Sequence, residues 1–192
     1  MTVSPAFVVA FAVVWAVTVF LLRYRRRWLV YYITAAFGFI LLVVMATKVT
    51  GWQNILEALE ASQVKTLSGL TGLSLDVLGG SGLAIPNHTG WAVFDIGIEC
   101  SALLEMSAII GLIGFYPAFR PGRRAANMAI GLAVTYVMNL ARIMLIVAII
   151  NAYGTAWVFP AHAVFGRVFF FIATIALYWY LITRPTVSIV NR

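Results

Sequence analysis

Charged residues are scarce in this sequence, and that scarcity decides its class. Only 10% of the 192 residues are Asp, Glu, Lys or Arg, whereas a soluble domain carries about 25%. Hydrophobic residues make up 63% of the chain. Because charged side chains cover the surface of a soluble protein, this composition excludes an ordinary water-soluble core. Apolar runs of roughly 18 residues or more predict an integral membrane protein instead.

Cysteine is almost absent, since Cys100 is the single one in the chain. One cysteine excludes an internal disulfide and any metal site built from several cysteines, so we predict neither a metal nor a cofactor. Acidic residues are also few and are confined to one stretch. They are Glu57, Glu60, Asp76, Asp95, Glu99 and Glu105.

Basic residues outnumber acidic ones and give a net charge of +7. Most of the arginines gather in short connections between apolar runs, namely Arg23, Arg25, Arg26, Arg27, Arg120, Arg123 and Arg124. This pattern is typical of cytoplasmic loops in membrane proteins. A nucleic-acid site would need polar and aromatic neighbours on a solvated face, which these loops lack. The charge therefore indicates membrane orientation, and we predict no nucleic-acid partner.

Five apolar segments are long enough to cross a membrane as helices. They cover residues 5–22, 29–47, 100–119, 125–150 and 164–183. The first has no basic residues before it and an arginine cluster after it, so it reads as a retained span rather than a signal peptide. We predict an all-α fold, a polytopic transmembrane helical bundle in a single membrane domain spanning residues 1–192.

The arginine clusters set the predicted orientation in the cell membrane. With residues 23–27 in the cytoplasm, the N-terminus lies outside, and five spans bring the C-terminus to the cytoplasm. Segments 48–99 and 151–163 then lie outside, and the loop 120–124 lies inside. Nine of the thirteen Lys and Arg residues fall in the cytoplasmic segments under this scheme. The scheme is therefore self-consistent.

The outer region 48–99 has three parts. Residues 52–67 place Trp52, Ile55, Leu56 and Leu59 at helical spacing with Glu57 and Glu60 opposite, which predicts an amphipathic helix lying on the membrane surface. Residues 68–90 are rich in Gly and Ser and predict a loop. Residues 91–98 predict a short strand or an extended approach to the third span.

Arg142 is a cation inside the fourth predicted span. A charge there costs about 2.5–3.5 kcal/mol on insertion scales, so it needs a partner or a polar cavity. Glu105 of the third span is a candidate partner, and Asn139 lies one helical turn away on the same face. Intramembrane arginines of this kind are candidates for a functional site.

Three polar residues from three spans fall in one predicted layer. Cys100 opens the third span, His162 sits in the outer loop before the fifth, and Arg142 lies roughly 12 Å from the outer end of the fourth. A free cysteine alone is usually a small buried hydrophobe. With a histidine as base and an arginine to favour the thiolate or hold an oxyanion, it becomes a candidate nucleophile. His88 is a competing base.

The ordered motifs Glu99-Cys100-Ser101, Asn139-x-x-Arg142-Ile143 and His162-x-x-x-Gly166 resemble the exosortase/archaeosortase family. The resemblance covers roughly residues 90–175, and the chain's size is closest to short, exosortase-G-like members. Ser101-Ala102 departs from the Ser-Gly that often follows the family cysteine, and longer relatives have more spans.

The resemblance implies a membrane cysteine transpeptidase whose site faces the exterior. Its substrates would be exported proteins with a C-terminal sorting signal that consists of a short motif, a transmembrane helix and a basic cluster. The family pattern implies Cys100 as nucleophile, Arg142 as essential cation and His162 as acid/base, with Glu99, Glu105 and Asn139 as possible supporting residues. The sequence leaves open the acceptor, an amine-bearing lipid or glycan, and whether water replaces it.

Two other readings stay open at this point. A transporter or channel would use Arg142 to bind an anionic solute within the membrane. A non-catalytic scaffold subunit would pair Arg142 with a carboxylate of another membrane protein. Only the enzyme requires Cys100.

Overall fold

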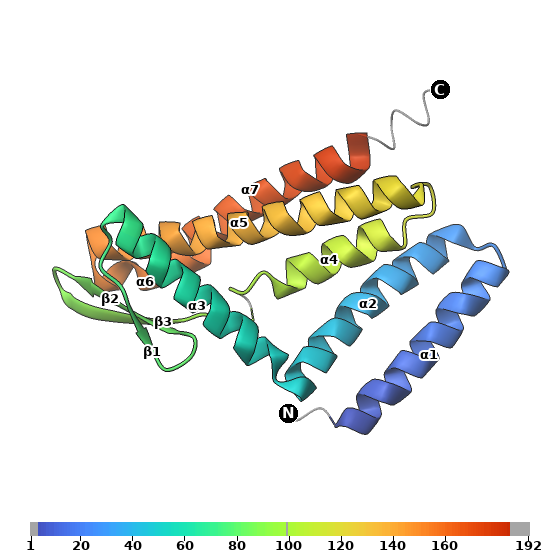
Figure 1. The fold of residues 1–192 in the computed structure, drawn as a ribbon, viewed down its shortest axis with the longest axis horizontal. Coiled ribbons are helices and arrows are strands. Elements are labelled where there is room, and N and C mark those ends of the chain that lie inside the picture. Colours follow the sequence, from blue (N-terminus) through green and yellow to red (C-terminus); the bar gives the residue numbers. More distant parts are fainter. Residues whose placement is uncertain (1–3, 99, 185–192) are drawn as a thin grey trace. The chain divides into compact units, whose positions relative to one another are not determined.

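The computed structural model describes residues 4–98 and 100–184, and most of them are helical (Figure 1). The chain forms two compact units. Unit 1 comprises the described residues of Met1–Gln53, Leu103–Ala133 and Tyr180–Arg192, and unit 2 comprises Asn54–Ala102 and Val134–Trp179. The single membrane domain stays a prediction.

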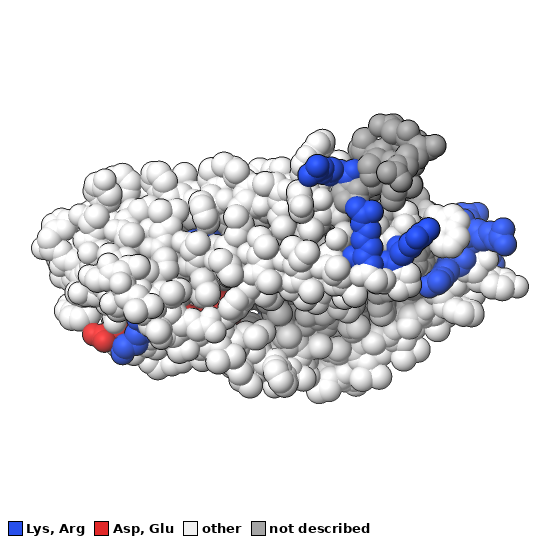
Figure 2. All heavy atoms as spheres, turned by 45° about the horizontal axis from the view of Figure 1, so that its top comes forward, with Lys and Arg blue, Asp and Glu red and all other residues white. Residues whose placement is uncertain are grey.

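Four helices are long and apolar enough to cross a membrane. They are α1 (Pro5–Tyr24), α2 (Trp28–Thr50), α5 (Pro121–Tyr153) and a continuous helical run over Thr155–Thr183. α1 contains no buried residue, and Phe20 on it is 68% exposed. Most of the face in Figure 2 carries no charged side chain. Exposed apolar surface on this scale indicates a helical membrane protein, as the composition predicts.

The third predicted span differs from the structure. The helix there, α4, covers only Leu103–Gly114, which is about 18 Å at 1.5 Å per residue and short for a hydrocarbon core of about 30 Å. The Gly97 carbonyl accepts hydrogen bonds from the backbone N–H groups of Cys100, at 2.8 Å, and Ser101, at 2.9 Å. That turn delays the helix start to Leu103, so the predicted bounds 100–119 are wrong at both ends.

Glycines bring the helices of unit 1 into close contact. Gly38 of α2 lies against the Trp15 ring of α1, and Trp15 Nε1 donates to the Thr34 carbonyl at 3.1 Å. Gly111 of α4 faces the backbone of Ala36, where an added Cβ would stand 3.0 Å from the carbonyl oxygen. Small residues of this kind let membrane helices approach closely.

Unit 2 contains a three-stranded antiparallel sheet, of which the sequence predicts only the last strand. Its strands are β1 (Asp76–Leu78), β2 (Gly82–Asn87) and β3 (Gly90–Asp95), in the order β1-β2-β3. The loop predicted for 68–90 is therefore wrong over β1 and β2. Its glycines occupy turns, as at Gly79 and Gly80, which have φ of 39° and 81°, while the apolar residues 83–85 are buried in strand pairing. The strand predicted within 91–98 is present up to Asp95.

Helix α3 (Trp52–Thr71) forms where an amphipathic helix is predicted, but its faces are reversed. Glu57 and Glu60 are only 6% and 4% exposed, whereas Trp52 and Ile55 are 59% and 52% exposed. In a membrane protein an apolar side chain is stable against lipid, and a carboxyl needs polar partners inside the protein. The reversed faces follow from that rule.

The last helical run begins earlier than predicted. α5 ends at Tyr153, Gly154 turns with φ of 88°, and helical structure resumes at Thr155. It continues through α6 (Val158–Pro160), a π-helix (Ala161–Gly166), α7 (Arg167–Tyr178) and a second π-helix (Trp179–Thr183). The predicted outer loop 151–163 is therefore helical except at Gly154.

The core of unit 2 joins these elements around the cysteine. Buried side chains of α3, the sheet and α5 form one hydrophobic cluster that includes Cys100 and Ala161. The β2–β3 turn is tied to the end of α5, because Asn151 Nδ2 donates to the Pro86 carbonyl at 2.9 Å. The backbone N–H of Thr155 donates to Thr89 Oγ1 at 3.0 Å. The sheet is thereby fixed to the end of α5 and to the start of the helical run that carries His162.

Candidate functional site

Cys100 lies in the segment between β3 and α4 and is only 2% exposed. The turn closed by the Gly97 carbonyl fixes its backbone N–H. On the other side, the buried Asn139 of α5 donates from Nδ2 to the Cys100 carbonyl at 2.8 Å. The backbone of the thiol-bearing residue is therefore held from two elements.

His162 contacts the thiol from the π-helix Ala161–Gly166. Cys100 Sγ is 3.3 Å from His162 Nδ1 and 3.7 Å from Nε2. The predicted outer loop is thus a helical segment, and the wide π turn is of the type that often occurs at functional sites. Phe94 of β3 packs against the imidazole at a tilt of 54°, with ring centroids 5.1 Å apart, and limits how the ring can turn.

Arg142 of α5 approaches the same sulfur. Its side chain is 3% exposed, and Nη2 donates a long hydrogen bond of 3.8 Å to Cys100 Sγ. The guanidinium lies over the Phe170 ring, with Cζ 5.3 Å from the centroid, in a cation–π contact. The structure thus brings together the three side chains that the sequence singles out.

Glu60 is a polar neighbour that the sequence analysis assigned to the polar face of a surface helix. Its Oε1 accepts a hydrogen bond of 3.2 Å from the Ala102 backbone N–H, two residues after the cysteine. Burial raises the pKa of the Glu60 carboxyl to about 7, against the lowering effects of the Ala102 N–H, Asn139 and Arg142. A carboxyl with this pKa changes charge near neutral pH, beside the candidate nucleophile.

The sequence names three further candidates, Glu105, His88 and Glu99. Glu105 is in the first turn of α4, in unit 1. His88 is exposed in the β2–β3 turn. The two ring nitrogens described above within 3.7 Å of Cys100 Sγ are those of His162. Glu99 lies outside the described residues. Within residues 4–98 and 100–184, no group of three His, Cys, Asp or Glu side chains is placed to hold a metal ion.

The arrangement has the parts needed for nucleophilic catalysis. A thiol within about 3.3 Å of an imidazole nitrogen can transfer its proton to that nitrogen. A guanidinium beside the sulfur favours the thiolate and can donate to an oxyanion. Because Cys100 and Arg142 are buried, little water competes for their hydrogen bonds, which strengthens the electrostatic effects.

Comparison with known proteins adds no relative to this picture. No protein-family model, no curated protein and no solved structure matches the chain.

Proposed function

We propose that this protein is a membrane-embedded cysteine protease/transpeptidase that cleaves a C-terminal sorting signal of exported proteins. The observation that carries the proposal is the double contact on one sulfur, with His162 Nδ1 at 3.3 Å and Arg142 Nη2 at 3.8 Å. The resemblance of the surrounding motifs to the exosortase/archaeosortase family names the substrate class. The described contacts supply the chemistry.

In the first half of the reaction, His162 accepts the thiol proton and the Cys100 thiolate attacks the peptide carbonyl carbon. Arg142 donates to the oxyanion of the tetrahedral intermediate. His162 then returns the proton to the amide nitrogen as the C–N bond breaks. The C-terminal fragment leaves as an amine, and the N-terminal part of the substrate remains as a thioester on Cys100.

In the second half, an amine of an acceptor lipid or glycan attacks the thioester carbonyl, and His162 takes the proton that the amine loses. The thiolate leaves as the new amide forms, and His162 reprotonates it. Water in place of the amine gives hydrolysis by the same steps. The bonds and protons balance in these steps without a redox partner, a metal or another cofactor.

The proposed setting is the cell membrane, with the N-terminus outside, the C-terminus in the cytoplasm and the site facing out. This setting requires α4 to act as a fifth crossing element. One observation in unit 1 supports it: Arg23, at the end of α1, and Arg124, at the start of α5, line the same cavity. The α1–α2 and α4–α5 connections therefore lie at one end of unit 1, as two cytoplasmic loops would.

The direct test is the processing of membrane proteins in cells that carry the wild type or Cys100→Ala. Mass spectrometry of C-terminal peptides should show proteins with a C-terminal apolar helix and basic tail cleaved in the wild type and full-length in the variant. His162→Ala should match Cys100→Ala, whereas the control His88→Ala, at an exposed histidine, should retain processing. Identical C-termini in wild type and Cys100→Ala would refute the proposal.

These variants, together with Arg142→Gln, separate the two other readings. A transporter of anionic solutes predicts that Arg142→Gln abolishes function while Cys100→Ala is silent. A scaffold predicts that Cys100 and His162 can both be replaced without loss.

A further inference from the structure

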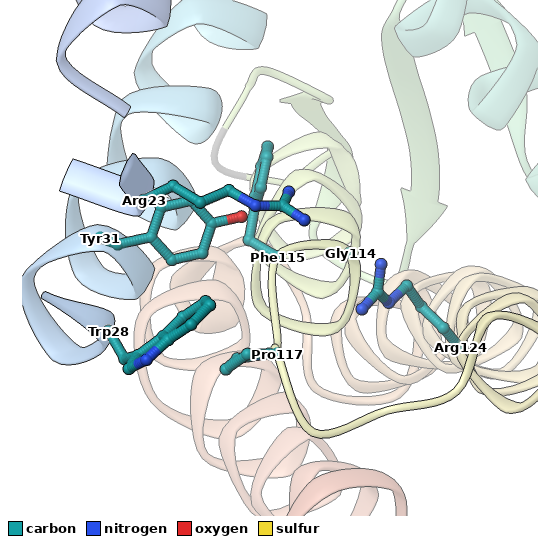
Figure 3. A pocket seen from close by; sticks show the side chains of 7 residues that line it. All are labelled: Arg23, Trp28, Tyr31, Gly114, Phe115, Pro117 and Arg124. Carbon is teal, nitrogen blue, oxygen red and sulfur yellow. The ribbon is translucent and has the colours of Figure 1, made fainter. Parts of the chain in front are cut away.

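A second site lies in unit 1. A cavity of about 360 Å³ is lined by Arg23, Trp28, Tyr31, Gly114, Phe115, Pro117 and Arg124. Figure 3 shows the guanidinium groups of Arg23 and Arg124 entering it from different helices, with aromatic side chains of α2 and of the α4–α5 connection beside them. Its volume is within the range of pockets that hold small ligands.

The Arg124 side chain is held in place and retains a donor. Its Nη2 donates to the carbonyls of Tyr116, at 2.9 Å, and Phe119, at 3.2 Å. Its Nε is buried and has no hydrogen-bond partner in the part of the chain that the structure describes. A guanidinium that is fixed on one side and unsatisfied on another is prepared to bind an anion.

Among the described residues of unit 1, no carboxylate lies close to this cavity. The only acidic residue within the sequence ranges of unit 1 is Glu105. It lies in the first turn of α4, whereas the cavity is at Gly114, the last residue of that helix, about 13 Å further along the axis. Exposed arginines at 25–27, 120 and 123 add positive charge, and Figure 2 shows Lys and Arg side chains gathered there. The described residues of unit 1 therefore supply no counter-charge at this cavity.

The aromatic lining identifies the depth of the cavity in the membrane. Trp28 and Tyr31 belong to the first turn of α2 and pack edge to face, with ring centroids 6.2 Å apart. Trp and Tyr at the ends of spanning helices lie at the level of the lipid headgroups. Arginines at that level meet the phosphates of anionic lipids.

We propose that this cavity binds a phosphate group between Arg23 and Arg124, and that an anionic phospholipid headgroup supplies it. The apolar faces of α1 and α2 leave room for the acyl chains, because many of their side chains are exposed. The site is separate from the cysteine chemistry, and its test does not depend on any substrate being known. Free inorganic phosphate is the other source of the same group.

The test is native mass spectrometry of the full chain released from detergent, titrated with phosphatidylglycerol or phosphatidylcholine of the same acyl chains. The wild type should bind the first phosphatidylglycerol about tenfold more tightly than phosphatidylcholine. Arg23→Gln should reduce that affinity about tenfold, the size of one lost charge-assisted hydrogen bond. Gly114→Leu, which fills the cavity without changing charge, should do the same. Arg124→Gln is avoided, because it would also break the two carbonyl contacts.

Arg25→Gln is the matched control, since it removes one exposed positive charge at the same end and does not line the cavity. Its affinity should stay within about twofold of the wild type. If millimolar inorganic phosphate displaces phosphatidylglycerol, the cavity binds phosphate but the free anion is its ligand. If it does not displace the lipid, the lipid headgroup is the ligand. Equal binding of both lipids, or equal losses in Arg23→Gln and Arg25→Gln, would overturn the proposal.

Discussion

Glu60 is the buried carboxyl whose charge bears most directly on the candidate site. It accepts a hydrogen bond from the Ala102 backbone N–H, two residues after the cysteine, and its pKa is raised from an ordinary value near 4.5 to about 7. Ionised, it would add a negative charge near Arg142 and the thiolate. Neutral, it leaves the arginine to stabilise the thiolate alone. The protonation state of Glu60 thus couples the fold to the chemistry near neutral pH.

The raised pKa of Glu60 predicts a pH-dependent effect of Glu60→Gln on stability. The folded state holds the Glu60 proton up to about pH 7 while the unfolded chain loses it near 4.5, so wild-type stability falls as pH rises through that window. Glutamine stays neutral, so the Tm of the variant should rise relative to the wild type by about 3 °C or more between pH 5 and pH 8.

The measurement is thermal unfolding of both proteins in one detergent at a fixed scan rate. Asp76→Asn, at a carboxyl whose side chain is 62% exposed, controls for the loss of one negative charge. A Tm difference between Glu60→Gln and wild type that stays constant from pH 5 to pH 8 would contradict the assignment.

The residue types decide which parts of the site were predictable. Cys100 and Arg142 stand out because a lone thiol and an intramembrane cation are unusual, and the spacing of His162 completes the motif. Glu60 was missed because helical periodicity reports two faces without saying which one is buried. The available signal was the membrane context, in which a carboxyl on an apolar helix turns inward.

At the scale of elements, close helix contacts depend on glycine. Gly38→Ala would drive a methyl group into the Trp15 ring and break the hydrogen bond of 3.1 Å to the Thr34 carbonyl. Overpacking of this kind costs about 1–3 kcal/mol, so the variant should unfold at lower temperature. Gly69→Ala, in α3 with open space around it, should be neutral or stabilising, because alanine favours helix by about 1 kcal/mol. Equal Tm values for the two variants would argue against the α1–α2 packing.

The long helices were predictable because apolar runs of this length have few alternatives. Strands β1 and β2 were not, since Gly, Ser and Pro mark turns between short strands as well as loops. The short length of α4 could not be predicted from the sequence either. The apolar run continues on both sides of it, and the turn at Gly97 that delays its start is a backbone feature with no strong sequence signal.

At the scale of the whole molecule, the open question is whether α4 crosses the membrane. The test uses Thr71→Cys and Ala125→Cys, each made with Cys100→Ala, because both positions are exposed. An impermeant maleimide added to intact cells should label Thr71→Cys, and Ala125→Cys only after permeabilisation. Labelling of both from outside would show that α4 does not cross and would remove the five-span arrangement.

The central claim is that Cys100 is an activated nucleophile, and its being the only cysteine makes the measurement direct. The rate of alkylation by a small, membrane-permeant reagent is followed against pH in the purified full chain, in wild type, Arg142→Gln and His162→Gln. Because the thiol is buried, the midpoint of each profile is compared rather than the absolute rate. We expect a wild-type midpoint well below about 8.5, the value of a simple thiol, and a shift toward that value in both variants. The same midpoint near 8.5 in all three proteins would contradict the account.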